Sequence, residues 1–349
     1  MSSLPAVQSG VSVTVIVPAF NEAGSIADTI ASIKAQSLRP TEIVVVDDCS
    51  TDGTGHIARS LGVRVIRPER NTGSKAGAQS FALDRIETEF CLVLDGDTIL
   101  APDAIEQLAP AFDDPGVAAA CTTVLPRRLD SIWERGRYVE YLFAFTFYKP
   151  VQDQWGAPMI SSGCCSMYRT AAVRAAGGWS ARTLAEDMDL TWTLCRQGWQ
   201  VRFMPAATCY PLEPSSWIFL SRQLRRWSHG FVQNVRLHWR GLLEVPYLRS
   251  AVAVATWDAA VASLIYLLVL PLLAIGFRNP WFLLGYVIDI PAIVVPVVMG
   301  AFPRREVLRA LACLPAFFAL RTVNALFFLQ ALWGEWIRGR PLLVYEKGH

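Results

Sequence analysis

The sequence lacks the cysteine and histidine spacings of metal-binding and redox proteins. Its eight cysteines form no CxxC pair, and no histidine accompanies them at the spacing of a zinc site. We therefore expect most of them to be reduced, buried side chains.

Charge is also scarce, since 18% of the residues are charged and 52% are hydrophobic. The net charge is +2 and no tail rich in lysine or arginine is present, so the sequence argues against nucleic-acid binding. Residues 1–10 have neither a charged region nor an apolar region of a signal peptide, and we expect the front of the chain to stay in the cytosol.

No GxGxxG follows the first predicted strand, which argues against a dinucleotide-dependent enzyme. From residue 11 the sequence instead alternates short β-branched runs with helical stretches. Strands are expected from residues 11, 42, 63 and 91, with helices at 26–34, 54–61 and 76–84 between them. This alternation predicts an α/β fold with a doubly wound, mostly parallel sheet, whose ligands bind at the carboxyl ends of the strands.

Long apolar runs are confined to the part of the sequence after residue 250. Residues 251–277 and 281–302 are long enough to span a membrane. Residues 307–333 carry Arg321 near the centre, which is costly in lipid, and charges at Arg338, Arg340 and Lys347 follow. We expect this third block to be kinked or re-entrant. The predicted organisation is a tail at 1–10, a catalytic domain at 11–215, an amphipathic interfacial region at 216–245, a membrane domain of two to three helices at 246–337 and a tail at 338–349.

Two carboxylates, Asp47 and Asp48, follow the second predicted strand. Helix capping explains one acid at this position, but hardly two in succession after a buried strand. We interpret them as ligand-binding residues, with Asp48 the firmer assignment.

Asp95 and Asp97 follow the fourth predicted strand, and Gly96 between them permits a tight turn. Mg²⁺ binds one or two carboxylates together with phosphate oxygens of a substrate, so these acids predict a metal–diphosphate site. A lone DxD is a weak motif, and its position after a core strand strengthens it. Lys75, in a glycine-containing loop before a helix, adds a cation for a phosphate, although such a segment alone is more often an ordinary loop.

Glu186, Asp187 and Asp189 begin a helix that continues to Cys195. Attack by a sugar hydroxyl requires a base, and we nominate Asp187. Acids in a first helical turn also simply favour the helix dipole. Farther on, apolar residues recur at helical spacing over 216–239, with Gln223, Arg226 and Trp227 among them. An arginine on this helix could bind a pyrophosphate, and a tryptophan could stack on the face of a sugar ring. The pattern alone describes an amphipathic helix that lies at a membrane surface or packs on the domain.

Taken in order, PAFNE, VDDCSTDGT, NTGSKAGA, DGD, SSGCCSMYR, AEDMDL and QLRRW resemble the family 2 glycosyltransferases, specifically the processive synthases of cellulose, chitin, hyaluronan and poly-N-acetylglucosamine. The resemblance covers about residues 11–230. It implies a GT-A fold, a UDP-sugar donor, Mg²⁺ or Mn²⁺, inversion at the anomeric carbon and a growing glycan as acceptor.

The resemblance also implies roles for residues at the matching positions. Asp187 is the implied base, and Asp95 and Asp97 the implied metal ligands. The implied nucleotide-sugar contacts are Pro18, Asn21, Glu22, Asp47, Asp48, Lys75, Asp95, Gln223, Arg226 and Trp227. The implied acceptor contacts are Ser162, Gly163, Cys164, Glu186 and Trp227.

Family synthases commonly have transmembrane helices before the catalytic domain, and none is seen here. Processivity and secretion therefore stay open, as do a homo-oligomer, a partner channel or a lipid-linked acceptor. We expect a multi-pass protein of the cytoplasmic (inner) membrane, in contact with lipids, with its catalytic domain in the cytosol.

The alternative functions are two. A polyprenyl-phosphate glycosyltransferase needs neither a hydroxyl base nor the Gln-Arg-Trp helix. An inactive membrane scaffold or sugar-binding module would be expected to have lost some of the acids at the motif positions. A nucleotidyltransferase would require a glycine-rich basic loop after the first strand, and residues 19–22 do not supply one.

Overall fold

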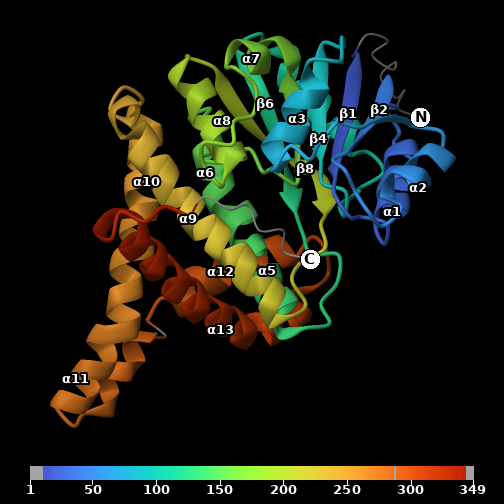
Figure 1. The fold of residues 1–349 in the computed structure, drawn as a ribbon. Coiled ribbons are helices and arrows are strands. Elements are labelled where there is room, and N and C mark those ends of the chain that lie inside the picture. The colour runs from blue at the N-terminus through green and yellow to red at the C-terminus, as the bar shows by residue number, and fades with distance from the viewer. Residues whose placement is uncertain (1–10, 287, 343–349) are drawn as a thin grey trace.

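The computed structural model describes residues 11–286 and 288–342, so the predicted tail at 1–10 and Lys347 lie outside the described residues. An eight-stranded sheet forms the N-terminal part, in the order β3-β2-β1-β4-β7-β6-β8-β5 (Figure 1). The strands are β1 (Val13–Ala19), β2 (Glu42–Asp47), β3 (Arg64–Ile66), β4 (Phe90–Leu94), β5 (Ile99–Leu100), β6 (Val117–Val124), β7 (Cys165–Arg169) and β8 (Gln200–Tyr210).

Helices cover both faces of this sheet, and the strands β1, β4 and β6 are buried along their whole length. In β1, Val13, Val15 and Val17 pack into the core under α1, whereas Ile16 packs into the core under α3 and α8. The helices of this part are α1 (Ile26–Lys34), α2 (Thr54–Ser60), α3 (Lys75–Leu83), α4 (Ala104–Leu108), the 3₁₀ helix η1 (Ala109–Asp113), α7 (Thr170–Ala175) and α8 (Glu186–Arg196). The predicted α/β fold with helices on both faces is therefore confirmed.

The sheet is mixed, because β7 lies antiparallel between β4 and β6, and β5 is antiparallel to β8. Strands β3, β2, β1 and β4 are mutually parallel, as predicted. The chain reaches β7 after a long helical excursion formed by α5 (Ile132–Phe143), the π-helical η2 (Ala144–Tyr148) and α6 (Lys149–Asp153). It re-enters the sheet at the carboxyl end of β4, where Leu94 pairs with Cys165. The residues just before β7 are thereby delivered to the edge where ligands are expected.

The amphipathic region 216–245 is one helix, α9 (Trp217–Leu242). Leu220 and Leu224 pack against Leu320, and Val232 packs against Phe328, so one side of α9 is covered by α13 (Val307–Leu332). Another side lies on α8. In Figure 1 α9 runs diagonally beneath the sheet, between the α/β domain and the C-terminal helices.

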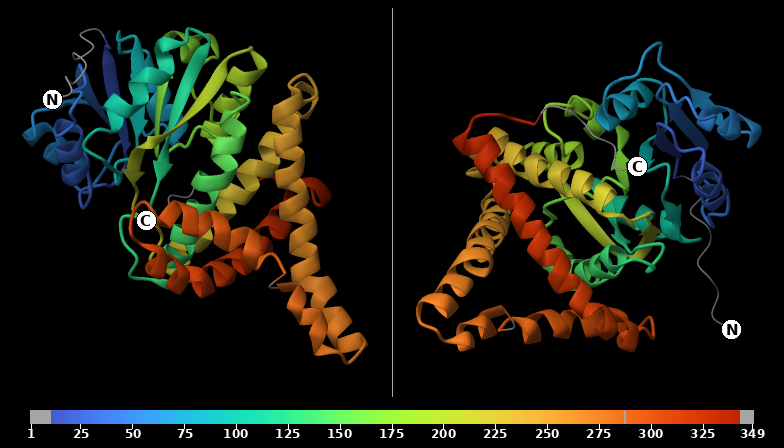
Figure 2. Two further views of the ribbon diagram at one scale, coloured as in Figure 1. Left: turned by 180° about the vertical axis from the view of Figure 1, so that it is seen from behind. Right: turned by 60° about the horizontal axis from the view of Figure 1, so that its bottom comes forward.

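Three helical segments of the described residues are long and apolar enough to cross a membrane. The first, Pro246–Gly276, comprises α10 (Pro246–Trp257), the π-helical η3 (Asp258–Ala262) and η4 (Ile265–Val269), and α11 (Leu270–Gly276). The second, Pro280–Ala301, comprises the 3₁₀ helix η5 (Pro280–Tyr286) and α12 (Ile290–Ala301). The third, Val307–Ile337, comprises α13 and the π-helical η6 (Trp333–Ile337). Figure 2 shows the three segments gathered on one side of the α/β domain.

In the structure α13 runs through the third block as a continuous helix with Pro315 inside it, and the expectation of a kinked or re-entrant segment stays a prediction. The expectation rested on the cost of a central arginine. Arg321 pairs with Asp289 at 2.5 Å and donates to the Tyr266 hydroxyl at 3.1 Å, so its charge is met by protein groups. Whether α13 crosses a bilayer stays a prediction.

Candidate active site

A cavity of about 1820 Å³ opens along the carboxyl ends of the parallel strands and extends to the C-terminal helices. Most side chains that the motifs singled out line it together. They are Pro18, Glu22, Asp48, Lys75, Asp95, Asp97, Ser162, Gly163, Cys164, Glu186, Asp187, Gln223, Arg226 and Trp227. Residues that are scattered over the sequence thus share one cavity, although their individual roles stay predictions.

Asp47 does not line the cavity, and its carboxylate contacts neighbouring loops instead. Successive residues at the end of a strand point to opposite sides, so Asp47 and Asp48 cannot both face the ligand edge. The Asp47 carboxylate pairs with Arg67 at 2.5 Å and accepts from the Ser50 amide at 3.0 Å. It lies against Gly55, where an added Cβ would stand 2.2 Å from the nearer carboxylate oxygen. These contacts give no support to its assignment as a nucleotide contact.

Asn21 also lies off the cavity wall. Its backbone has a positive φ of 55°, which asparagine tolerates better than most residues, and its side-chain oxygen accepts from the Thr51 amide at 2.9 Å. Asn21 thereby joins the loops that follow β1 and β2.

Asp48 faces the cavity and organises the loop before α3. Its carboxylate accepts from the Thr72 amide and from the Thr72 hydroxyl, both at 2.8 Å, and its carbonyl accepts from the Asn71 side chain at 2.7 Å. The loop that carries Lys75 is therefore fixed to the carboxyl end of β2.

Lys75 joins three parts of the site. Its ammonium pairs with Asp95, donates to the Gly163 carbonyl at 2.8 Å and lies 3.9 Å from Glu186. The Asp95 amide in turn donates to the Cys164 carbonyl at 3.1 Å. The segment before β7 is therefore tied to the end of β4 through both backbone and side chain.

The residues that would hold a divalent cation are Asp97 and Asp95. Asp97 is 9% exposed and lines the cavity, and Gly96 makes room for Glu22, whose Cγ would stand 2.9 Å from an added Cβ. Within the described ranges no three acidic, histidine or cysteine side chains form a complete protein cage for a metal. This donor set fits an ion such as Mg²⁺, which uses one or two carboxylates and takes the rest of its shell from substrate phosphates and water.

Asp187 is held at the cavity wall by backbone amides. One of its carboxylate oxygens accepts from the Gly163 amide at 2.8 Å and the other from the Met188 amide at 2.8 Å. A Cβ on residue 163 would stand 2.8 Å from the first oxygen, so glycine permits this approach. Burial raises the pKa of the neighbouring Glu186, and the charge of Lys75 acts in the opposite direction. Asp187 is half-buried and lines the cavity beside Glu186.

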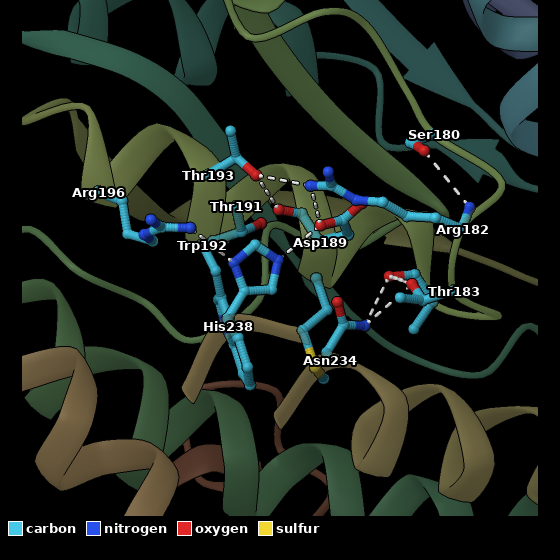
Figure 3. A network of polar contacts seen from close by, with 12 residues as sticks. Ser180, Arg182, Thr183, Asp189, Thr191, Trp192, Thr193, Arg196, Asn234 and His238 are labelled. Atoms are coloured by element: carbon cyan, nitrogen blue, oxygen red, sulfur yellow. Dashed lines mark hydrogen bonds and ion pairs between the residues drawn. The ribbon is translucent and has the colours of Figure 1, made fainter. Parts of the chain in front are cut away.

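Helix α9 is fixed to the segment that enters α8. Gly230 allows the close approach, since an added Cβ would lie 2.7 Å from the Ala185 Cβ. The Asn234 side chain donates to the Ala185 carbonyl at 3.1 Å and to the Thr183 hydroxyl at 3.2 Å (Figure 3). The helix bearing Gln223 is therefore held in register with the helix bearing the candidate base.

Figure 3 shows the second connection between these helices, centred on Asp189. The carboxylate pairs with His238 of α9 at 2.6 Å and receives two hydrogen bonds from Arg182, at 2.7 and 2.8 Å. Burial alone would raise the pKa of Asp189, but the hydrogen bonds from His238 and Arg182 and the Arg182 charge hold that pKa below its ordinary value of 3.8. The ion pair therefore contributes stability above about pH 4, and this contribution is lost as the pH falls through the lowered pKa.

We expect Asp189→Asn to reduce the free energy of unfolding by about 2 kcal/mol, because the buried His238 and the half-exposed Arg182 lose their charged partner. Thermal unfolding of the detergent-solubilised protein at a fixed scan rate measures the change. Glu89→Gln, which alters an exposed pair with Arg169, is the control and should change the stability by less than about 0.5 kcal/mol. Equal unfolding temperatures for the two variants would contradict the assigned role.

A charged network behind Trp227 was not predicted from the sequence. Arg137 of α5 is 1% exposed, pairs with Glu140 and Glu213, and has its guanidinium carbon 4.4 Å from the centre of the Trp227 ring. It also donates to the Gln223 side chain at 3.0 Å. The capping box of Ser131 and Glu134 predicts the start of α5, but no local sequence pattern predicts that Arg137 pairs with Glu213.

The cysteine prediction agrees with the structure, in which every cysteine is free and the described ones are buried or half-buried.

Comparison with known proteins agrees with this geometry. Residues 14–176 match the model of the family described as Glycosyl transferase family 2. The poly-beta-1,6-N-acetyl-D-glucosamine synthase of Staphylococcus aureus strain MSSA476 is 26% identical over 223 residues, which are 62% of this chain and 54% of that protein. The N-acetylglucosaminyltransferase of Azorhizobium caulinodans is 27% identical over 299 residues, 80% of this chain and 75% of its own. The chain thus spans about half the length of the synthases it matches.

Among solved structures, the mannosyltransferase PcManGT of Pyrobaculum calidifontis in complex with GDP-Man and Mn²⁺ has the same fold, with a TM-score of 0.61 and 21% identity. The alignment covers 93% of this chain and 87% of that one. Residues 1–349 of TarS from S. aureus in complex with UDP align with a TM-score of 0.52 and 15% identity, over 91% of each chain. These likenesses extend beyond the α/β domain and establish the GT-A-like fold.

Proposed function

We propose that this chain, a glycosyltransferase whose residues 14–176 form a family 2 domain, transfers a sugar from a UDP-sugar to an acceptor hydroxyl with inversion at the anomeric carbon. The observation that carries the proposal is the shared cavity. Asp48, Asp97, Asp187 and Arg226 come from four separate parts of the sequence and line one space at the ligand edge of the sheet.

Each end of the reaction has a candidate group in this cavity. Asp187 would take the proton of the attacking hydroxyl, because its carboxylate is fixed by the Gly163 amide and faces the cavity. Arg226 and Lys75 would bind the diphosphate. A divalent cation held by Asp97 and Asp95 would neutralise the charge that develops on the leaving group. A single base without a second nucleophilic carboxylate favours one displacement, and one displacement inverts the configuration.

The membrane assignment is part of the proposal. The three apolar helical segments support membrane association, and we propose a multi-pass protein of the cytoplasmic membrane with its catalytic domain in the cytosol, where nucleotide sugars are made. Contact with lipids follows from this arrangement.

The test uses the purified full chain in phospholipid vesicles with Mg²⁺ or Mn²⁺ and a panel of radiolabelled nucleotide sugars. UDP-N-acetylglucosamine comes first in the panel because the names of the two curated relatives specify N-acetylglucosamine. We expect release of UDP from one donor and incorporation of its sugar into a product whose anomeric configuration is inverted. Failure of every UDP-sugar to bind or to release UDP would refute the proposed function.

A further inference from the structure

The cavity does not end at the catalytic acids. It continues between η2, α12, η3, η4 and α13, and we call this extension the helix arm of the cavity. Its walls are formed mainly by aliphatic and aromatic side chains, among them Ala259, Ile293, Met299, Phe317 and Phe328. The candidate base and a hydrocarbon-like surface therefore belong to one continuous space.

Such walls suit a hydrocarbon chain better than a glycan. Sugar hydroxyls that leave water need hydrogen-bond partners, and each missing partner costs about 1–3 kcal/mol. The aliphatic and phenylalanine side chains of the helix arm offer none, whereas an acyl or prenyl chain loses no hydrogen bond there and gains from burial. Val295 and Met299 line the arm and are 58% and 63% exposed, so neither side chain is covered by other parts of the described protein.

The charges of the arm discriminate between lipid headgroups. Its acids are Glu140, Glu213, Asp258 and Asp289, and its bases are Arg137, Lys149 and Arg321. Arg321 is paired with Asp289 at 2.5 Å, and Arg137 is paired with both Glu140 and Glu213. The third base, Lys149, donates to the Ile160 carbonyl rather than to a carboxylate. The arm as a whole therefore has four carboxylates and three cationic groups, so it offers an anionic headgroup no net positive charge. A phosphate would meet more acid than base on its way to Asp187.

The junction between the arm and the catalytic acids is polar. Asn324 of α13 lines the cavity and donates to Glu140 at 3.2 Å, which connects it through Arg137 to Trp227. Its side-chain oxygen is buried and has no hydrogen-bond partner among the described residues. A carbonyl oxygen in this position is suited to accept a hydrogen bond from a hydroxyl group.

We propose that the acceptor is an uncharged membrane lipid with a free hydroxyl group, whose chain lies in the helix arm while its hydroxyl reaches Asp187. The inference rests on the proposed function and specifies its acceptor. The lipid oxygen forms the bond to the anomeric carbon, its proton passes to the Asp187 carboxylate, and the bond to UDP breaks with the electron pair leaving on the diphosphate. The product is a glycolipid whose lipid part carries no charge.

The experiment reconstitutes the full chain in phosphatidylcholine vesicles that contain diacylglycerol, a ceramide or undecaprenyl phosphate, with the labelled donor found in the panel. We expect label in the organic phase with diacylglycerol or the ceramide and at least about tenfold less with undecaprenyl phosphate. Label only with undecaprenyl phosphate, a long water-soluble polymer, or donor turnover without any lipid product would overturn the inference. In each of these cases the donor is still used, so the proposed function survives; absence of donor binding and of UDP release refutes that function instead.

A pair of variants tests the helix arm directly. Ala292 lies on α12, lines the arm and is exposed, so Ala292→Trp should narrow the arm with little effect on the fold. We expect it to raise the KM for the lipid about tenfold, which corresponds to about 1.4 kcal/mol, and to leave UDP binding unchanged. The matched control is Ala253→Trp on α10, an exposed alanine that does not line the cavity, and it should stay within about twofold of the original protein. Equal KM values in the two variants, with UDP binding intact, would place the lipid elsewhere.

Discussion

Asp187→Asn should lower turnover by roughly 10² to 10⁴-fold while UDP binding stays nearly unchanged. The asparagine side chain has the same shape and can still accept the hydrogen bond from the Gly163 amide, which meets the carboxylate at 2.8 Å. It cannot take the proton of the acceptor hydroxyl, because an amide is a far weaker base than a carboxylate. The substitution therefore removes proton acceptance and keeps the shape of the side chain, at the cost of the hydrogen bond from the Met188 amide.

Steady-state rates with the panel donor and UDP affinity by calorimetry measure the two effects separately. Asp84→Asn is the matched control, since Asp84 is exposed at the end of α3 away from Lys75, about 13 Å along the helix. It should retain full turnover. Unchanged turnover in Asp187→Asn would remove Asp187 from the mechanism, and loss of UDP binding together with turnover would assign it a structural role instead.

Asp97→Ala should abolish most of the metal dependence of donor binding and reduce activity by at least about 10²-fold at ordinary Mg²⁺ or Mn²⁺ concentrations. Asp97 is the more buried of the two acids of the DGD turn, and Asp95 is already paired with Lys75. Removing Asp97 leaves Asp95 as the remaining anionic ligand of the cation. The Asp95 carboxylate is shared with the Lys75 ammonium group.

Titration of UDP affinity against Mg²⁺ and Mn²⁺ tests this expectation without relying on turnover. The original protein should bind UDP more tightly as the cation is added, and Asp97→Ala should show a weak response. Asp84→Ala serves as the control for the loss of a carboxylate. A variant at position 97 that binds UDP with undiminished metal dependence would contradict the assignment of this aspartate.

Much of the α/β domain was predictable because its signals are local. Alternating β-branched runs and helical stretches located β1 to β4 and α1 to α3 within a few residues, and acids placed after parallel strands have to meet at the carboxyl edge. The antiparallel insertion of β7 was not predicted. The five residues of β7 have the pattern of any short strand. The antiparallel direction of β7 depends on its pairing with β4, where Cys165 lies opposite Leu94.

The same distinction separates Asp48 from Asp47. Both follow one strand, and residue types alone assigned both to the ligand. The alternation of side chains sends Asp48 into the cavity and Asp47 toward Arg67, a choice that depends on which face of the sheet carries the site.

By itself, the sequence determined the fold class, the order of the motifs and the apolar C-terminal segments, because periodicity and strand-end chemistry act over a few neighbouring positions. The strand-end acids and the family resemblance together predicted most of the residues that line the candidate site. The tertiary structure alone decided how α9 docks on α8 through Gly230 and Asp189, how Arg137 supports Trp227, and how Arg321 finds Asp289. It also decided that the cavity at the carboxyl ends of the strands continues into a mainly apolar arm between the C-terminal helices. These features depend on contacts between residues far apart in the chain, and the free energy of such contacts is set by packing rather than by any local pattern.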